Sequence, residues 1–123
     1  MNKQLQQVID FHQKFNVQLK DEPTLVNTEE LLKRYKFMRE EVEEYLEGAE
    51  KGDLPNIAKE LCDVLYVTYG TIISHGLQHV IDDVFDEVHR SNMSKEWHPY
   101  KIKKGKDYQE ADVDKFFNNL TSD

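Results

Sequence analysis

The stretch EELLKRYKFMREEVEEYLEG, residues 29–48, has the repeat of an amphipathic α-helix. Its apolar side chains return every three or four residues, so they share one face. Asn27 can cap the first amides, while Glu30 reaches back from the third helical position. Gly52 suits the left-handed backbone conformation that commonly ends a helix. The pattern predicts a helix whose buried stripe consists of Leu31, Leu32, Tyr35, Met38, Val42, Tyr45, Leu46 and Ala49.

A second stretch, KELCDVLYVTYGTII at residues 59–73, is apolar on nearly every side of a helix. Asp53 is the expected N-cap, Pro55 suits the first turn, and Gly76 predicts an end after about Ser74. A helix that is apolar nearly all the way round is normally surrounded by others. We therefore expect this segment at the centre of a helical core.

Two further helices are predicted on either side of this pair. The first covers residues 3–19 and buries Leu5, Val8, Ile9, His12, Phe15 and Leu19. The other covers residues 78–92 and buries Val80, Ile81, Val84, Phe85 and Val88. After them we expect a loop and a last helical turn with Phe116, Phe117 and Leu120. No strand is predicted, although YKIKK at residues 100–104 alternates briefly, so the fold class is all-α.

Length and charge limit the classes of function. A chain of 123 residues is long enough for one core, so a single domain spanning residues 1–123 is expected. The 24 acidic and 16 basic residues give a net charge of −8, which repels nucleic acid and anionic membranes. Cys62 is the one cysteine, expected to be a small buried residue, and we expect a cytoplasmic protein that crosses no membrane.

Five acidic residues form the most unusual feature. At 100° per residue, Glu40, Glu41 and Glu44 share one edge of their helix, and Glu60 and Asp63 point the same way from the next. A short connection makes the helices antiparallel neighbours, so both sets of acids can face each other.

The acids are expensive to bring together. Two carboxylates about 5 Å apart repel by on the order of 3 kcal/mol at an effective dielectric near 20. Since no lysine or arginine occurs from Leu61 through Ile81, the third helix is expected to offer no compensating base. Oxygen ligands suit a hard divalent cation, with Mg²⁺ preferred and Mn²⁺ as a substitute. The alternative is a solvated acidic face, the usual meaning of a glutamate-rich helix in a highly charged chain.

The spacing Glu40-Glu41-x-x-Glu44, 15 residues, Glu60-x-x-Asp63 resembles the EExxE…ExxD signature of the MazG-like, all-α nucleoside triphosphate pyrophosphatase superfamily. VIDFHQKFNVQLKDEPTL and FDEVHRSNMSK resemble other parts of phage- and bacterial-type members. The resemblance implies an oligomeric bundle of four to five helices that splits the α–β phosphoanhydride of a nucleotide into monophosphate and pyrophosphate. It also implies catalytic roles for Glu40 and Glu41, and Mg²⁺ ligands at Glu41, Glu44, Glu60 and Asp63.

The same resemblance points to substrate contacts nearer the C-terminus. Asn92 and Lys95 lie in SNMSK, where the family places phosphate or sugar contacts, and Arg90 is a nearby candidate. Lys104 and Tyr108 match a family tail that folds over the substrate, so residues 95–123 are expected to be a loop and a lid. Many relatives continue with prolines where this chain has Glu110 and Ala111, and a plain solvated tail is the alternative.

Two functions from different classes follow. The first is Mg²⁺-dependent cleavage of a nucleoside triphosphate, with a deoxynucleotide as the expected substrate and a homodimer or tetramer as the expected assembly. The second is a non-catalytic helical module whose acids contact a basic protein partner. A ferritin-like redox centre is disfavoured because it requires Glu-x-x-His on two helices. His75 and His79 have metal-like spacing, but Gly76 between them favours a capping or surface role.

Overall fold

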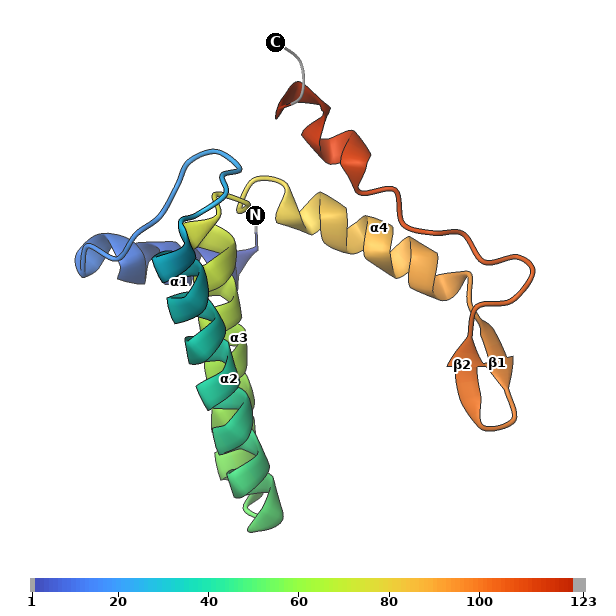
Figure 1. The fold of residues 1–123 in the computed structure, drawn as a ribbon. Coiled ribbons are helices and arrows are strands. Elements are labelled where there is room, and N and C mark those ends of the chain that lie inside the picture. Colours follow the sequence, from blue (N-terminus) through green and yellow to red (C-terminus); the bar gives the residue numbers. More distant parts are fainter. Residues whose placement is uncertain (1, 121–123) are drawn as a thin grey trace. The chain divides into compact units, whose positions relative to one another are not determined.

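The computed structural model describes residues 2–120, and most of them are helical. The elements in order are α1 (Lys3–Lys14), α2 (Thr28–Glu50), α3 (Leu54–Ser74), α4 (Ile81–Met93), β1 (Glu96–His98), β2 (Lys101–Lys103) and a 3₁₀ helix (Asp114–Leu120) (Figure 1). The all-α prediction is confirmed. The chain divides into two compact units, Met1–His79 and Val80–Asp123, and each is described by itself. Among the described residues, no helix combines the length and apolar character needed to cross a membrane.

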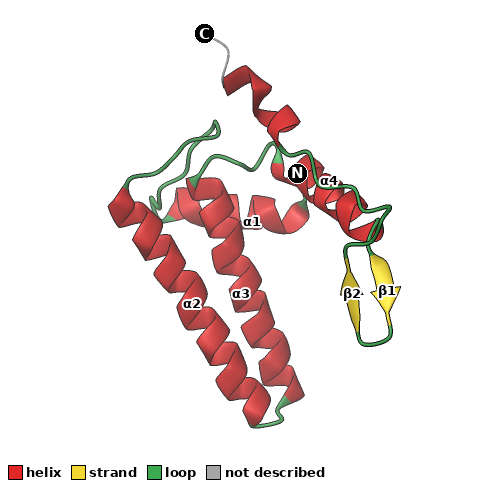
Figure 2. Cartoon of the chain, turned by 45° about the vertical axis from the view of Figure 1, so that its right-hand side comes forward, coloured by secondary structure: helices red, strands yellow, loops and turns green. Residues whose placement is uncertain are grey.

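The paired helices α2 and α3 dominate the first unit and lie side by side in both views (Figures 1 and 2). Both predicted N-caps are present: the side chain of Asn27 accepts a hydrogen bond from the Glu30 amide at 2.9 Å, and that of Asp53 accepts one from the Asn56 amide. Gly52 has φ of +70°, the left-handed conformation that glycine adopts without strain. These residues fix the tight turn that sends α3 back along α2.

The loop after α1 is fastened to the C-terminal end of α3. The Lys20 amide donates to the Ile73 carbonyl at 3.1 Å, and the Thr24 amide donates to the His75 carbonyl at 2.8 Å. Gly76 has φ of +68°, and a Cβ there would collide with the backbone of Glu22. Glycine at this turn therefore both ends α3 and lets the loop approach it closely.

The first helix is shorter than predicted. It ends at Lys14 rather than near Leu19, because Asn16 adopts φ of +55°, a left-handed conformation that stops a helix and that asparagine tolerates. The fully buried side chains of the first unit include Leu5, Val8 and Ile73, where α1 packs on α3.

Several residues predicted to be buried are exposed in this chain. On α2 the apolar stripe is half covered, because α3 is its one extensive helical neighbour among the described residues. The prediction of burial was therefore wrong for Leu31, Leu32, Tyr35, Val42 and Leu46 on α2. It was also wrong for Phe15, just after α1, and for Phe85 and Val88 on α4. Cys62 is exposed too, contrary to its predicted burial, because it lies on a side of α3 that α2 does not cover.

The second unit contains the one clear error in secondary structure. Residues 96–103 form an antiparallel hairpin in which Trp97 pairs with Ile102 and His98 with Lys101 (Figure 2). Residues 100–104 do alternate as a strand does, but three residues are too few for alternation to identify a strand from the sequence. The fourth helix begins at Ile81 rather than Gln78, and Val80 precedes it without a side-chain cap.

Candidate metal centre

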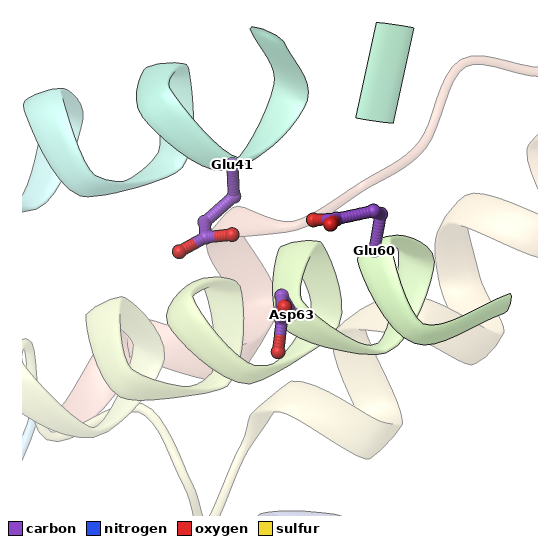
Figure 3. Close-up of side chains that lie close together, drawn as sticks. All are labelled: Glu41, Glu60 and Asp63. Carbon is purple, nitrogen blue, oxygen red and sulfur yellow. The ribbon is translucent and has the colours of Figure 1, made fainter. Parts of the chain in front are cut away.

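Three predicted ligands meet between α2 and α3. Glu41 comes from α2, while Glu60 and Asp63 lie one turn apart on α3 (Figure 3). Each offers one carboxylate oxygen, and these three atoms all lie within 4.8 Å of one another. The acids face one another across the helix pair, so they are not an ordinary solvated face.

Glu44 and Glu40 are both exposed, and neither is among the three residues whose oxygens meet. Glu44 lies close enough to Glu41 for its negative charge to be among the causes that raise the pKa of the Glu41 carboxyl group. Glu40 is 55% exposed, and its Oε1 lies 3.9 Å from the Lys36 Nζ. Glu40 and Glu44 also line a hollow of about 360 Å³ on the outer side of α2, together with Lys36, Arg39 and Glu43.

Two buried oxygens in the cluster have no partner. The Oε2 atoms of Glu41 and Glu60 accept no hydrogen bond from any described residue. A buried acceptor without a donor costs about 1 to 3 kcal/mol, and more when it is charged. Burial raises the pKa of Glu41 above its ordinary value of 4.5, and the neighbouring charges of Glu44, Asp63 and Glu60 raise it further.

One cation does reach the cluster from within the chain. The Lys59 Nζ lies 2.7 Å from the Asp63 Oδ2, and this hydrogen bond is the main cause that raises the pKa of Lys59. The expectation that α3 offers no compensating base was therefore wrong, because Lys59 lies one turn before Asp63 on the same face. Lys59 is 66% exposed and leaves the buried oxygens of Glu41 and Glu60 unpaired.

The donor set suits a hard divalent ion. Carboxylate oxygens without sulfur or imidazole are the ligands that Mg²⁺ and Mn²⁺ prefer, and the two orphaned oxygens are groups that such an ion would satisfy. The histidine pair with metal-like spacing, His75 and His79, lies outside this group of ligands. His75 caps α3 and its Nδ1 lies 3.0 Å from the Thr24 carbonyl oxygen, which matches its predicted capping role, and His79 is exposed.

A buried polar group at the far end of α2 escaped sequence reasoning. Arg34 is 4% exposed, and its Nε donates to the Glu30 Oε1 at 3.2 Å. The Ser74 hydroxyl bridges to the same oxygen at 3.5 Å, and the His12 Nδ1 donates to the Gln18 carbonyl at 2.9 Å. Glu30 thus binds Arg34. The capping-box pattern predicted instead that Glu30 would accept a hydrogen bond from the Asn27 amide. The spacing of Glu30 and Arg34, four apart, was the available signal.

The aromatic residues of α1 pack against α3. Phe11 lies with its ring centroid 4.9 Å from that of Phe15 and 5.5 Å from that of Tyr66. Beside them is an open cavity of about 330 Å³ lined by Gln4, Gln7, Val8, Cys62, Leu65, Tyr66 and Tyr69. At 100° per residue, Cys62 and Leu65 point away from the side of α3 that carries Glu60 and Asp63, so this cavity is separate from the acidic cluster.

The predicted substrate contacts all lie in the second unit. The Arg90 guanidinium binds Glu87 through Nε at 2.7 Å and Nη2 at 2.8 Å, and it also donates to Gln109. The Ser91 hydroxyl lies 3.3 Å from the Tyr108 hydroxyl, and the Lys104 Nζ lies 4.9 Å from the centroid of the Tyr108 ring. Asn92 is exposed and Lys95 half-buried just after α4. Their roles toward a substrate stay predictions.

The chain belongs to the all-α nucleoside triphosphate pyrophosphatase superfamily, and three carboxylates of its EExxE and ExxD motifs, Glu41, Glu60 and Asp63, meet between α2 and α3. More closely, the sequence profile of phosphoribosyl-ATP pyrophosphohydrolase matches residues 8–92, and the chain belongs to that family. It is therefore a pyrophosphohydrolase, a hydrolase that acts on acid anhydrides. A search among curated proteins gave no match. The matched residues contain α2, α3 and the acidic cluster and end before the hairpin at residues 96–103.

Proposed function

We propose that the protein hydrolyses the α–β phosphoanhydride of a nucleoside triphosphate, releasing a monophosphate and pyrophosphate, and that it requires Mg²⁺. The observation that carries the proposal is the meeting of Glu41, Glu60 and Asp63 with two buried oxygens that have no hydrogen-bond donor. Family membership supports the class of reaction. A deoxynucleotide is the proposed substrate.

The carboxylates have distinct proposed roles. Glu41, Glu44, Glu60 and Asp63 would hold the ion, which when bound neutralises these acids, polarises phosphoryl oxygens and activates water. Glu40 is more exposed, and with Glu41 it would orient the attacking water and accept its proton. The pairing of α2 with α3 would bring these side chains together before substrate arrives, which would lower the entropic part of the barrier.

Further parts of the proposal concern residues outside the cluster. Asn92, Lys95 and Arg90 are proposed to contact phosphate or sugar, and Lys104 and Tyr108 to contact the substrate from the C-terminal segment. Side chains of this kind supply the donors that a triphosphate needs beyond the ion. A homo-oligomer is proposed because several large apolar side chains of α2 and α3 are exposed in the single chain.

The decisive experiment is a nucleotide panel assayed with and without Mg²⁺, in which pyrophosphate and orthophosphate are resolved. We expect pyrophosphate from at least one deoxynucleoside triphosphate, and no product when the metal is chelated. Orthophosphate as the first product would contradict cleavage at the α–β bond. A chain that is inert toward every purine and pyrimidine triphosphate would favour the non-catalytic partner module instead.

A further inference from the structure

The contact between α2 and α3 keeps one register along its whole length. Near the start of α2, Glu30 meets Ser74 of α3 through the 3.5 Å hydrogen bond. Four residues further on, Arg34 reaches the backbone of α3 at Gly70, where a Cβ would lie 2.9 Å from the Arg34 Nη1 and 3.2 Å from the Nε2 of His12 on α1. Advancing four residues on α2 thus corresponds to going back four residues on α3.

The same register leads to the acidic cluster. Seven residues beyond Arg34 is Glu41, and seven residues before Gly70 is Asp63, which is its neighbour in the cluster. Seven residues are two helical turns, or about 10 Å along each axis, so these side chains return to the same face. Three more residues in each direction bring Glu44 opposite Glu60.

A second close contact lies on the other side of the cluster. Gly48 is buried on α2, and a Cβ there would collide with the Asn56 Nδ2 of α3 and lie 3.6 Å from the Glu60 Cγ. Gly48 and Asn56 continue the register by four further residues on each helix. At each end of the contact between α2 and α3, a glycine on one helix therefore has a polar side chain of the other helix lying against it.

We propose that Gly48 and Gly70 are positioning residues: by leaving room for the side chains that lie against them, they set the register and spacing of the metal ligands on the two helices. Both glycines lie inside helices, where glycine costs about 0.8 to 1 kcal/mol relative to alanine. Their backbone angles do not require glycine, since neither has positive φ. The close approach of the Asn56 side chain accounts for Gly48, and that of the Arg34 and His12 side chains accounts for Gly70.

An effect on metal binding is expected because the distances between a metal ion and its ligand oxygens tolerate little change. Carboxylate oxygens bind Mg²⁺ at about 2.0 to 2.1 Å in a nearly ideal octahedron, so a shift of a few tenths of an ångström between the helices weakens the site. The three ligand oxygens come from both helices, and no single helix can correct such a shift. This inference rests on the proposed function, because it assumes that the cluster binds a divalent ion.

The test is titration of Mn²⁺ alone into the metal-free full-length protein, followed by calorimetry or by electron paramagnetic resonance of free Mn²⁺. We expect Gly48→Ala and Gly70→Ala each to weaken Mn²⁺ binding about 10- to 100-fold, the usual effect of disturbing groups that support metal ligands. Circular dichroism should show unchanged helix content, because alanine favours helices.

A compensating variant separates positioning from general damage. The side chain of Asn56 makes no hydrogen bond among the described residues, so Asn56→Ala alone should bind Mn²⁺ like the unaltered protein. Combined with Gly48→Ala, it should restore most of the lost affinity by making room for the new methyl group.

A matched pair on α3 provides a second check. Ser74→Ala removes a hydroxyl that reaches Glu30 on α2, whereas Thr71→Val removes one that bonds only to Val67 in its own helix. Weaker Mn²⁺ binding in the Ser74→Ala variant alone supports the inference.

Equal Mn²⁺ affinity in both glycine variants and the unaltered protein would overturn the inference and leave the proposed function intact. An unaltered protein that binds no Mn²⁺ would overturn the proposed function itself.

Discussion

At the scale of single residues, the cluster is costly for the metal-free fold. Glu41 shows this best, because it is half-buried, it has an unpaired oxygen, and its neighbours are carboxylates. Lys59 forms its ion pair with Asp63 and donates no hydrogen bond to the buried Oε2 atoms of Glu41 and Glu60. Residues that lower the stability of the ligand-free protein are expected at sites where a bound ligand offsets that loss.

Glu41→Gln should abolish Mg²⁺-dependent hydrolysis yet stabilise the metal-free protein at neutral pH. Because the pKa of Glu41 is raised in the folded state, the folded chain keeps this proton to higher pH than the unfolded chain does. Stability of the metal-free protein therefore falls as pH rises from about 4.5 through the raised pKa. Thermal melts in chelator across this range should show a smaller fall for the variant. An identical pH dependence in both proteins would argue against a strained carboxylate.

His12 predicts a pH effect of opposite sign. Burial lowers the pKa of His12 from 6.5, and the nearby Arg34 cation lowers it further, against the hydrogen bond to the Gln18 carbonyl. Since the unfolded chain binds this proton near pH 6.5, the stabilising contribution is complete above that pH and is lost as pH falls through the lowered value. His12→Asn, which keeps a donor near the Nδ1 position, should cost about 1 to 3 kcal/mol at pH 7.5 and show a weaker acid dependence. Denaturant titrations at several pH values measure both effects, and unchanged acid dependence would contradict the neutral, buried state.

At the scale of elements, the chain is organised by side chains that join one segment to another. In the second unit Glu87 is 5% exposed and joins three segments: it binds Arg90 within α4, accepts the Asp112 amide at 2.7 Å, and lies 3.7 Å from the Lys115 Nζ. The segment after the hairpin is thereby fastened along α4. Residues 109–115 therefore form a strap that these contacts and the hydrogen bond from Arg90 to Gln109 hold against α4.

Glu87→Gln should loosen this strap at neutral pH. The hydrogen bonds from Arg90 and the Asp112 amide are the main causes that lower the pKa of Glu87 from 4.5 to about 2. The carboxylate therefore stabilises the unit above pH 4.5, and this contribution disappears as pH falls toward about 2. Hydrogen exchange at the Asp112 amide should be faster in the variant at pH 7, and the difference should shrink in acid. Equal exchange rates at pH 7 would mean that other contacts hold the segment.

At the scale of the whole molecule, the first unit exposes more apolar surface than a small monomer usually does. Leu54 is 72% exposed and Leu65 is 53% exposed on α3, a helix that its sequence marks as surrounded. We propose that helices of a second copy of this chain cover these apolar side chains.

Leu65→Glu should therefore reduce the oligomeric mass. A charge in a buried apolar interface is unpaired and costs several kcal/mol, enough to dissociate a moderate assembly. Leu25→Glu is the matched control, because Leu25 is 93% exposed in the loop before α2 and should tolerate the charge. Light scattering after size-exclusion chromatography gives the masses. A monomeric unaltered protein would contradict the proposed assembly.

The sequence alone determined the helices, their caps and the identity of the acidic residues. Asn27, Asp53, Gly52 and Gly76 act through local geometry, which depends on neighbours in the chain and can be recognised without tertiary information. The repeat of the apolar residues likewise gave the orientation of the acids on each helix.

Only the tertiary structure decided which side chains meet. The burial of Arg34 and the close contacts at Gly48 and Gly70 depend on the separation and register of two helices. The short hairpin also escaped prediction, because three residues carry too little periodicity and its stability comes from pairing across the turn. A linear pattern encodes faces of helices, but the distance between two faces is set by how their side chains pack.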